Sequence, residues 1–194
     1  AGNTITGTVK ATTGTVPIAS GATYTPTTWT NGNVTVTLPT KSGYSTVYTT
    51  NGTAPTKDSI KYSAAFTVSG NCKINYLYTD GTNIGGAGTV NVTNIDKLAP
   101  NAFTPKTTLT TNSIKVDGTT TDATATSTNG SSGIKEYRFS KDGGKTYTNA
   151  QTSATYTFSG LTQKVEYTIV VEAKDNAGNT TTGTVKATTG TVPT

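Results

Sequence analysis

The sequence predicts an all-β protein made of two tandem β-sandwiches in an extended arrangement, and three observations lead to this prediction. Thr, Val, Ile and Tyr, which favour strands, are abundant, and apolar residues alternate with polar ones in short runs. Turn signals such as Asn-Gly and Asp-Gly separate these runs. The sequence also repeats itself over a long period, which is typical of a chain of domains.

The repeat is a segment that occurs near both ends of the sequence. Residues 1–17 and 177–193 are identical except that Ile5 corresponds to Thr181. The period, which runs from Ala1 to Ala177, is too long for a solenoid and suits a tandem array of domains. Because residues 177–188 should end a domain, we expect residues 1–12 to be the last strand of a preceding repeat. Such a strand should either be disordered or dock on a neighbouring molecule in place of residues 177–188.

The repeat sets the expected domain boundaries. Residues 1–17 should hold the last strand and linker of the preceding repeat, 18–96 a first sandwich, 97–188 a second sandwich, and 189–194 the start of the next linker. The segment Asn94–Pro100 between the sandwiches is short and ends in proline, so we expect it to be fairly stiff.

The first sandwich is predicted from short strands separated by turns. Val34, Val36 and Leu38 alternate with threonines, which indicates one buried and one solvated face. Similar runs predict strands near residues 24–26, 34–38, 44–49, 65–68, 74–78 and 90–92. Regularly spaced short strands favour a β-sandwich.

The second sandwich repeats this plan. Ile114 and Val116 correspond to Val34 and Val36, and at the same offset Leu109 corresponds to Trp29. We therefore expect Trp29 and Leu109 to be equivalent core residues. Further along the chain, residues 156–158 correspond to residues 66–68 at a larger offset, so an insertion must lie within the polar loop Gly118–Ser131.

A late strand of the second sandwich carries a family resemblance. Tyr167, Ile169, Val171 and Ala173 share one face, and Leu161 lies six residues before Tyr167. This pair resembles a fibronectin type III domain, in which the tyrosine forms a corner by bonding back through its hydroxyl. The resemblance implies structural roles for Leu161 and Tyr167.

Two further segments extend the resemblance. The sequence Asp-Asn-Ala-Gly-Asn at 175–179 resembles a turn of bacterial immunoglobulin-like repeats, and residues 132–147 are similar to such repeats in Gram-positive surface proteins. The resemblance covers the second sandwich well and the first weakly. It implies an immunoglobulin-like fold in a secreted or wall-attached, extracellular bacterial protein, and it implies no reaction.

Residues 140–147 also resemble the Asp-box of sialidases and other propellers, with Tyr147 where Trp is usual. In that motif the aspartate, here Asp142, bonds the backbone of a hairpin turn. A single copy outside a propeller predicts a structural role for Asp142.

The residues that could carry catalysis do not form a suitable group. The chain has no histidine, the commonest general base. Glu166 and Glu172 lie on one strand face about 20 Å apart at ~3.3 Å per residue, whereas glycosidases need roughly 5–9.5 Å between their carboxyl groups. Asp117 and Asp122 flank the insertion and should be solvated. We therefore expect no catalytic residues and no enzyme activity.

No cofactor and no metal site are expected either. Asp80, Asp96 and Asp175 lie near predicted domain ends, where calcium could stiffen an array. Calcium takes roughly six to eight oxygen ligands, however, and the ten acidic residues are spread along the sequence.

The net charge of +5 comes from dispersed lysines and one arginine, which argues against a nucleic-acid partner. No apolar run is long enough for membrane insertion.

These patterns favour a stalk or spacer whose partners are neighbouring repeats of the same chain. An alternative is an adhesin that binds a host protein or glycan through the loop 118–131, with Asp122 and Asn129 as candidate contacts. A second alternative is a set of accessory domains in a secreted enzyme or a phage fibre.

Overall fold

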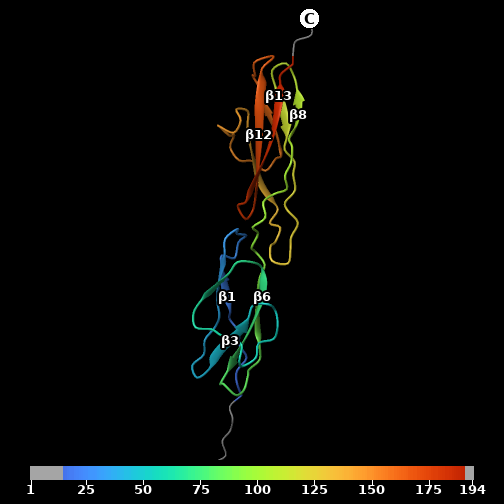
Figure 1. The fold of residues 1–194 in the computed structure, drawn as a ribbon. Helices are drawn as coiled ribbons and strands as arrows, with labels where there is room; N and C mark the ends of the chain where they lie inside the picture. Colours follow the sequence, from blue (N-terminus) through green and yellow to red (C-terminus); the bar gives the residue numbers. More distant parts are fainter. Residues whose placement is uncertain (1–14, 191–194) are drawn as a thin grey trace, which may run out of the picture. The chain divides into compact units, whose positions relative to one another are not determined.

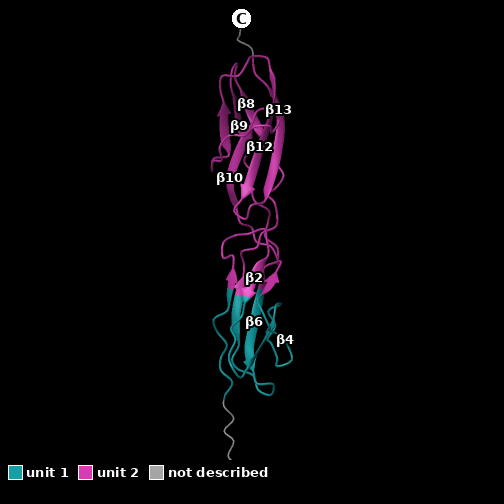
Figure 2. Ribbon diagram, turned by 90° about the vertical axis from the view of Figure 1, so that its left-hand side faces the viewer, with its two compact units in different colours: residues 1–23, 37–65, 73–90 teal, residues 24–36, 66–72, 91–194 magenta. Residues whose placement is uncertain are grey.

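The computed structural model describes residues 15–190, which form two compact units (Figures 1 and 2). Unit 1 contains residues 15–23, 37–65 and 73–90, and unit 2 contains residues 24–36, 66–72 and 91–190. The strand predicted within residues 1–12 and the final linker residues 191–194 lie outside the described residues.

Strands are the regular elements of the described residues, which confirms the all-β prediction. They are β1 (Thr23–Thr25), β2 (Val34–Thr37), β3 (Ser45–Thr49), β4 (Ile60–Lys61), β5 (Phe66–Val68), β6 (Cys72–Thr79), β7 (Gly88–Val92), β8 (Lys106–Leu109), β9 (Ile114–Asp117), β10 (Ile134–Ser140), β11 (Thr155–Phe158), β12 (Glu166–Asp175) and β13 (Thr180–Thr188). Within residues 15–190 the structure holds no helix that could cross a membrane.

The sheet order confirms the predicted immunoglobulin-like fold. In unit 2, strands β8, β9 and β11 form one sheet and β10, β12 and β13 form another. Taken in chain order, these are strands A, B and E and strands C, F and G of an immunoglobulin sandwich. The earlier strands follow the same plan, with sheets β1-β2-β5 and β4-β3-β6-β7, to which β4 adds an edge strand.

The strand pairing reproduces the internal duplication. Val34 of β2 pairs with Val68 of β5, and Ile114 of β9 pairs with Phe158 of β11. These are the residues that the two sequence offsets match with each other, Val34 with Ile114 and Val68 with Phe158. The duplicated segments therefore share a strand register as well as a hydrophobic pattern.

The core of the second sandwich lies between its two sheets. Phe139 is fully buried and stacks on Tyr156, with 5.5 Å between the ring centroids. The buried cluster consists of Ile114, Val116, Tyr137, Phe139, Phe158, Leu161, Ile169, Val171, Ala173 and Ala187. Both sheets contribute residues to this cluster. Packing in the cluster therefore holds the two sheets, and the ends of their strands, against each other.

Candidate functional site

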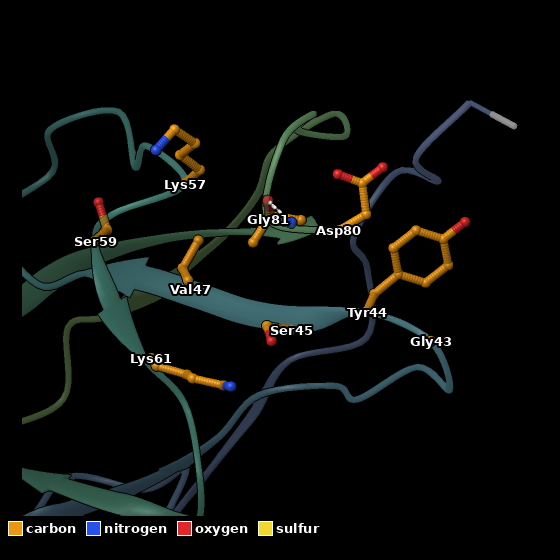
Figure 3. Close-up of a pocket in the computed structure, with 10 residues that line it drawn as sticks. Gly43, Tyr44, Ser45, Val47, Lys57, Ser59, Lys61, Asp80 and Gly81 are labelled. Atoms are coloured by element: carbon orange, nitrogen blue, oxygen red, sulfur yellow. Dashed lines mark hydrogen bonds between the residues drawn. The ribbon is translucent and has the colours of Figure 1, made fainter. Parts of the chain in front are cut away.

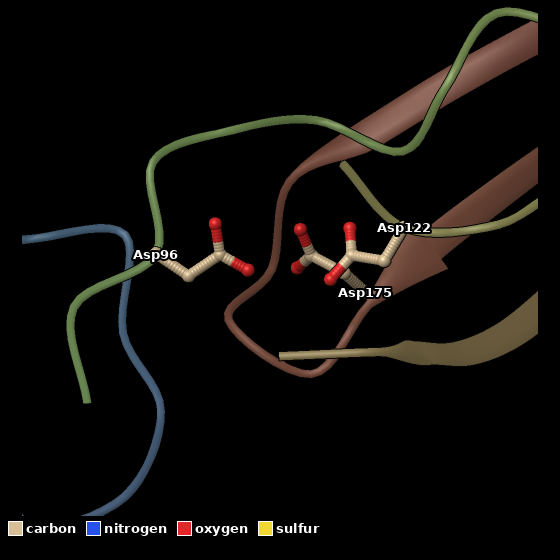
Figure 4. Close-up of side chains that lie close together, drawn as sticks. All are labelled: Asp96, Asp122 and Asp175. Atoms are coloured by element: carbon tan, nitrogen blue, oxygen red, sulfur yellow. The ribbon is translucent and has the colours of Figure 1, made fainter. Parts of the chain in front are cut away.

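Three aspartates converge in unit 2 at the end of strand β12. Asp175 is the last residue of β12, Asp96 precedes β8, and Asp122 lies in the inserted loop. Their side chains point toward one another (Figure 4), and the carboxylate oxygens all lie within 4.8 Å of one another. Asp96 and Asp175 are fully buried, and Asp122 is half-buried. The expectation that the acidic residues are too dispersed to meet is therefore wrong for these three.

Backbone N–H groups hold each of these carboxylates. Asp175 Oδ1 accepts hydrogen bonds from Gly178 N at 2.6 Å and Asn179 N at 2.8 Å. Asp96 Oδ2 accepts one from Ser132 N at 2.8 Å, and Asp122 Oδ2 accepts one from Gly133 N at 2.6 Å. Hydrogen bonds to the charged form stabilise a buried carboxylate. The turns around the site therefore supply backbone donors to all three carboxyl groups.

The three acidic side chains meet without a basic partner among the described residues. None of the four ion pairs found among residues 15–190 involves Asp96, Asp122 or Asp175. Carboxylate oxygens are the ligands that calcium takes in proteins, so these are the described residues that could hold such a cation, although they supply only part of its usual shell.

Asn179 connects this cluster to the segment before β8. Its Nδ2 donates to Asp175 Oδ2 at 2.7 Å, to the carbonyl of Asp96 at 2.9 Å and to that of Leu98 at 3.2 Å. The Asp-Asn-Ala-Gly-Asn turn thus positions both a carboxylate and the chain that carries Asp96. The sequence did not predict that Asp122 belongs to this carboxylate cluster, because Asp122 lies in a polar insertion far from Asp96 and Asp175 along the chain. Asp80 is elsewhere, in unit 1, bonded within its own turn.

Asp122 and Asn129, which were predicted to contact a partner, make their contacts within unit 2. Asp122 belongs to the carboxylate cluster, and Asn129 Oδ1 accepts a hydrogen bond from Lys97 N at 3.3 Å. The loop backbone is also anchored, because Asn71 N donates to Thr128 O at 2.7 Å and Gly130 N donates to Ile95 O at 2.7 Å. Binding of a partner through this loop stays a prediction.

An open cleft of 640 Å³ lies on the outer face of strands β10 and β12. Arg138 Nε donates to Glu172 Oε1 at 3.0 Å, and its guanidinium lies 5.1 Å from the ring centre of Tyr147. The Glu172 carboxylate raises the pKa of Arg138 above its ordinary value. This charged and aromatic surface is partly exposed and offers hydrogen bonds to a polar ligand.

A second cleft, of 490 Å³, lies in unit 1 (Figure 3). Its lining comprises Gly43, Tyr44, Ser45, Val47, Lys57, Ser59, Lys61, Thr79, Asp80 and Gly81. Tyr44 and Asp80 lie at one end of the cleft and Lys57 at the other. An aromatic ring beside polar groups is a surface on which a sugar ring could stack.

The tyrosine corner implied by the resemblance has its hydrogen bond. Tyr167, near the start of β12, accepts a hydrogen bond on its hydroxyl from Thr162 N at 3.0 Å. Leu161 is buried, at 6% exposure, and its own N–H donates to Asn112 O at 2.9 Å. Hydrogen bonds from Leu161 N and Thr162 N therefore hold the loop before β12 in place.

Removal of this hydroxyl should have a modest cost. We expect Tyr167→Phe to lower the free energy of unfolding by about 1 kcal/mol, because one hydrogen bond is lost while the ring stays packed. Urea unfolding of the variant and the wild type measures the difference. Tyr24→Phe, at a half-buried tyrosine of β1, controls for hydroxyl loss as such, and an equal effect in both variants would contradict a special role for the corner.

Asp142 organises the turn after β10 as the Asp-box resemblance implies. Its Oδ1 accepts hydrogen bonds from Ser140 Oγ at 2.6 Å and from Thr146 N at 3.0 Å, and its Oδ2 accepts one from Thr146 Oγ1 at 2.6 Å. These bonds, that of Ser140 above all, hold the pKa of the Asp142 carboxyl well below its ordinary value. All of these partners lie in the same turn, so the place of Asp142 in the structure is that of a turn stabiliser.

The prediction that Trp29 and Leu109 are core residues is wrong. Trp29 is 37% exposed and Leu109 is 44% exposed. Leu109 ends β8, an edge strand of its sheet. The Trp29 ring covers Gly130, where a Cβ atom would lie only 2.4 Å from Cζ3. The inserted loop therefore provides the surface that Trp29 packs on, a contact that the comparison with Leu109 could not predict.

Part of the chain matches a known family. Residues 18–90 match the family model described as the chitobiase/beta-hexosaminidase C-terminal domain. The comparison with curated protein sequences found no match.

Solved structures with a similar course of the chain include three sets of tandem domains. The FN1-FN3 domains of chicken CNTN1 are 13% identical, with 91% of this chain and 69% of that chain covered and a TM-score of 0.37. The fibronectin(III)-like modules of Clostridium thermocellum CbhA are 14% identical, with coverages of 88% and 94% and a TM-score of 0.38. Domains A168-A170 of titin are 13% identical, with coverages of 92% and 62% and a TM-score of 0.47.

Proposed function

We propose that this chain is a non-catalytic accessory module that acts as a stiff spacer in a secreted or cell-surface bacterial protein. The observation that carries the proposal is the place of the repeated segment in the fold. The second copy of the repeated segment forms the turn and strand β13 that end the second sandwich. Directly after that strand, Gly190 N donates a hydrogen bond to Thr110 O at 2.8 Å. This bond holds the chain against the turn that follows β8. In this proposal one full period of the repeat is one structural module.

The segment that joins the two predicted sandwiches supports stiffness. Thr30 N donates to Asn94 O at 3.0 Å, and Asp96 N donates to Thr30 O at 2.9 Å. Asn94 Nδ2 also donates to Pro26 O at 2.9 Å and Thr28 O at 2.6 Å. Residues 91–97 therefore belong to the same compact unit as residues 24–36 and the second sandwich. Two further bonds connect this part of unit 2 to the inserted loop, Gly130 N to Ile95 O at 2.7 Å and Asn71 N to Thr128 O at 2.7 Å. A connection that is hydrogen-bonded in this way resists bending better than a free linker.

The family match supports the accessory role. The model that residues 18–90 match describes the C-terminal domain of carbohydrate-active enzymes. A repeat module that precedes or follows a catalytic or adhesive domain would hold that domain at a fixed distance. An extracellular location at a Gram-positive surface belongs to the same proposal and rests on the resemblance of residues 132–147 and 175–179.

Single-molecule pulling of the chain between two handles tests the spacer. We expect cooperative unfolding peaks, because the strands must be broken as packed sheets, and a lower peak force for unit 2 when Asn179 is replaced with aspartate. Smooth extension without peaks, as from a flexible polymer, would contradict the proposal. An unchanged force in the Asn179→Asp variant would show that the carboxylate cluster does not support the joint.

A second candidate function is contact with a glycan through the cleft in unit 1. It is favoured by the position of this cleft inside the segment that matches the carbohydrate-enzyme domain. Calorimetric titration with a chitooligosaccharide would then show binding that Tyr44→Ala abolishes. Tyr147→Ala, which alters an aromatic residue of the other cleft, is the matched control. No heat of binding for the wild type would leave the spacer as the sole proposal.

A further inference from the structure

Most of the exposed large apolar side chains lie where the chain enters unit 1 or leaves unit 2. Within residues 15–190, six large apolar side chains are exposed. Trp29 packs on the inserted loop, and Ile60 lies in the short edge strand β4. The other four are Ile18, Ile84, Leu109 and Val165. Single exposed apolar side chains are common, but a group of them at one place marks a surface that binds another surface.

The chain leaves the second sandwich beside two of these side chains. Thr189 N donates to Val165 O at 3.2 Å, and Val165 N donates to Thr189 Oγ1 at 3.3 Å. Gly190 N donates to Thr110 O at 2.8 Å, and Thr110 directly follows Leu109. The exposed apolar surface of Leu109 and Val165 therefore lies at the end of unit 2 from which the chain continues.

The chain enters unit 1 beside the other two side chains. A Cβ atom at Gly86 would lie only 2.8 Å from Ile18 Cγ1, and one at Gly85 would lie 3.1 Å from Val16 Cγ1. Gly85 directly follows Ile84. The entering segment therefore runs along residues 84–86, and the missing side chains of the two glycines allow this close approach. Val16 is half-buried there, whereas Ile18 and Ile84 stay exposed.

The repeat connects these two ends by very little chain. Residues 13–17 and 189–193 are both Thr-Gly-Thr-Val-Pro, so in a tandem array the counterpart of Val16 follows Gly190 after one residue. Gly190 is hydrogen-bonded within unit 2, and Val16 packs within unit 1. Two steps along an extended chain, at ~3.6 Å each, allow roughly 7 Å between them. The end of one module must therefore lie close against the start of the next.

The repeat also indicates which apolar side chains belong to such a contact. Val16 recurs as Val192, whereas Thr194 stands at the position of Ile18. Threonine at that position offers less apolar surface. The starting end of a module is therefore better represented by Val16 and Ile84 than by Ile18.

We propose that the end of unit 2 formed by Leu109 and Val165 docks on the end of unit 1 formed by Val16 and Ile84 in the next copy of the module along the same chain. This inference rests on the tandem array of the proposed function. Each end is assigned to the other because the short connection holds them together and because both expose apolar side chains. Contact between them removes this surface from water, which is favourable.

A chain of two modules, in which residues 1–190 are followed by residues 15–194, tests the contact by thiol labelling. In a Cys72→Ser background, Val165→Cys is placed either in the first module, at the junction, or in the second module, where the same end has no module after it. The rate of maleimide labelling is followed by mass spectrometry. We expect several-fold slower labelling at the junction, because burial limits access to the thiol. Ile84→Cys should show the opposite order, with slower labelling in the second module.

The two members of each pair share the same local fold, so they are matched controls for each other, and in urea they should react at equal rates. Leu109→Lys in the first module should speed the labelling of Ile84→Cys in the second, because a charge at the junction weakens an apolar contact. Leu109→Lys in the second module should leave that rate unchanged. Equal native rates within either pair, or equal effects of the two lysine variants, would overturn the proposal.

Failure of this contact can be distinguished from failure of the spacer. Pulling on the single chain measures the resistance of the strands and does not involve a junction between modules. Equal labelling rates together with cooperative unfolding peaks would overturn the contact and leave the spacer in place. Unequal labelling rates together with smooth extension would support the contact and contradict the spacer.

Discussion

Replacing Asn179 with aspartate is expected to lower the free energy of unfolding by about 3–5 kcal/mol at pH 7, because each buried acceptor left unsatisfied costs about 1–3 kcal/mol. The substitution keeps the shape of the side chain but removes the Nδ2 donor, leaving Asp175 Oδ2 and the carbonyls of Asp96 and Leu98 without that partner. A fourth carboxylate also enters a cluster that already holds three within 4.8 Å of one another. Both effects act in the same direction.

The pH dependence separates these two effects. Burial and the neighbouring carboxyl groups should raise the folded-state pKa of the carboxyl that Asn179→Asp introduces. Its destabilising effect is then full above that raised pKa and is lost as pH falls to the ordinary value of about 4 in the unfolded chain. The deficit of Asn179→Asp relative to Asn179→Ala should therefore shrink between pH 7 and pH 3.5. Urea unfolding followed by Trp29 fluorescence reports on unit 2, and EDTA in the buffer excludes stabilisation by divalent cations. Asn176→Ala is the matched control, because Asn176 lies in the same turn but is exposed and bonds the carbonyls of Ser132 and Gly133. A loss as large in the control would contradict the role given to Asn179.

Replacing Phe139 with alanine is expected to lower the free energy of unfolding by about 3–5 kcal/mol. The side chain is fully buried in β10, opposite Val171 of β12, and stacks on Tyr156 of the other sheet. Its loss removes apolar contacts on both sides and leaves a cavity that two hydrogen-bonded sheets cannot close. The same urea titration measures the effect through the unfolding midpoint and slope.

Two further variants serve as comparisons for the loss of stability in Phe139→Ala. Phe139→Leu should cost clearly less than Phe139→Ala, because it fills part of the cavity. Val165→Ala, at a residue that is 38% exposed, should change stability by less than about 0.5 kcal/mol. If Phe139→Ala were no worse than Val165→Ala, the core placed between the two sheets would be incorrect.

The fold could be predicted from the sequence where the information is local or repeated. Alternation in Val34–Leu38 and in Tyr167–Ala173 follows from one buried and one solvated sheet face, and those segments form strands β2 and β12. The two offsets between the halves of the sequence predicted equivalent strands, and the structure gives these strands the same register. Tyr167 could be identified because its hydrogen-bond partner, Thr162, lies in the loop directly before its own strand.

The carboxylate cluster depends on information that is not local. Asp96, Asp122 and Asp175 come from a linker, an insertion and a turn, and only tertiary folding brings them together. The error over Trp29 has the same origin. Its burial was inferred from Leu109, whereas its actual neighbour is Gly130, in an insertion that has no counterpart in the first sandwich.

The position of the duplicated segment also bears on how genes for such proteins change in length. Exchange of genetic material anywhere within the shared segment, residues 1–17 and 177–193, joins one position to its equivalent in the next period. The product gains or loses one whole period, and the hybrid segment still carries glycine at the positions of Gly178 and Gly183. In the described copy such a junction falls within the turn at 175–179, strand β13 or the residues directly after it. In the tandem array that we propose, such an exchange would change the number of modules and leave the sequence of each module complete.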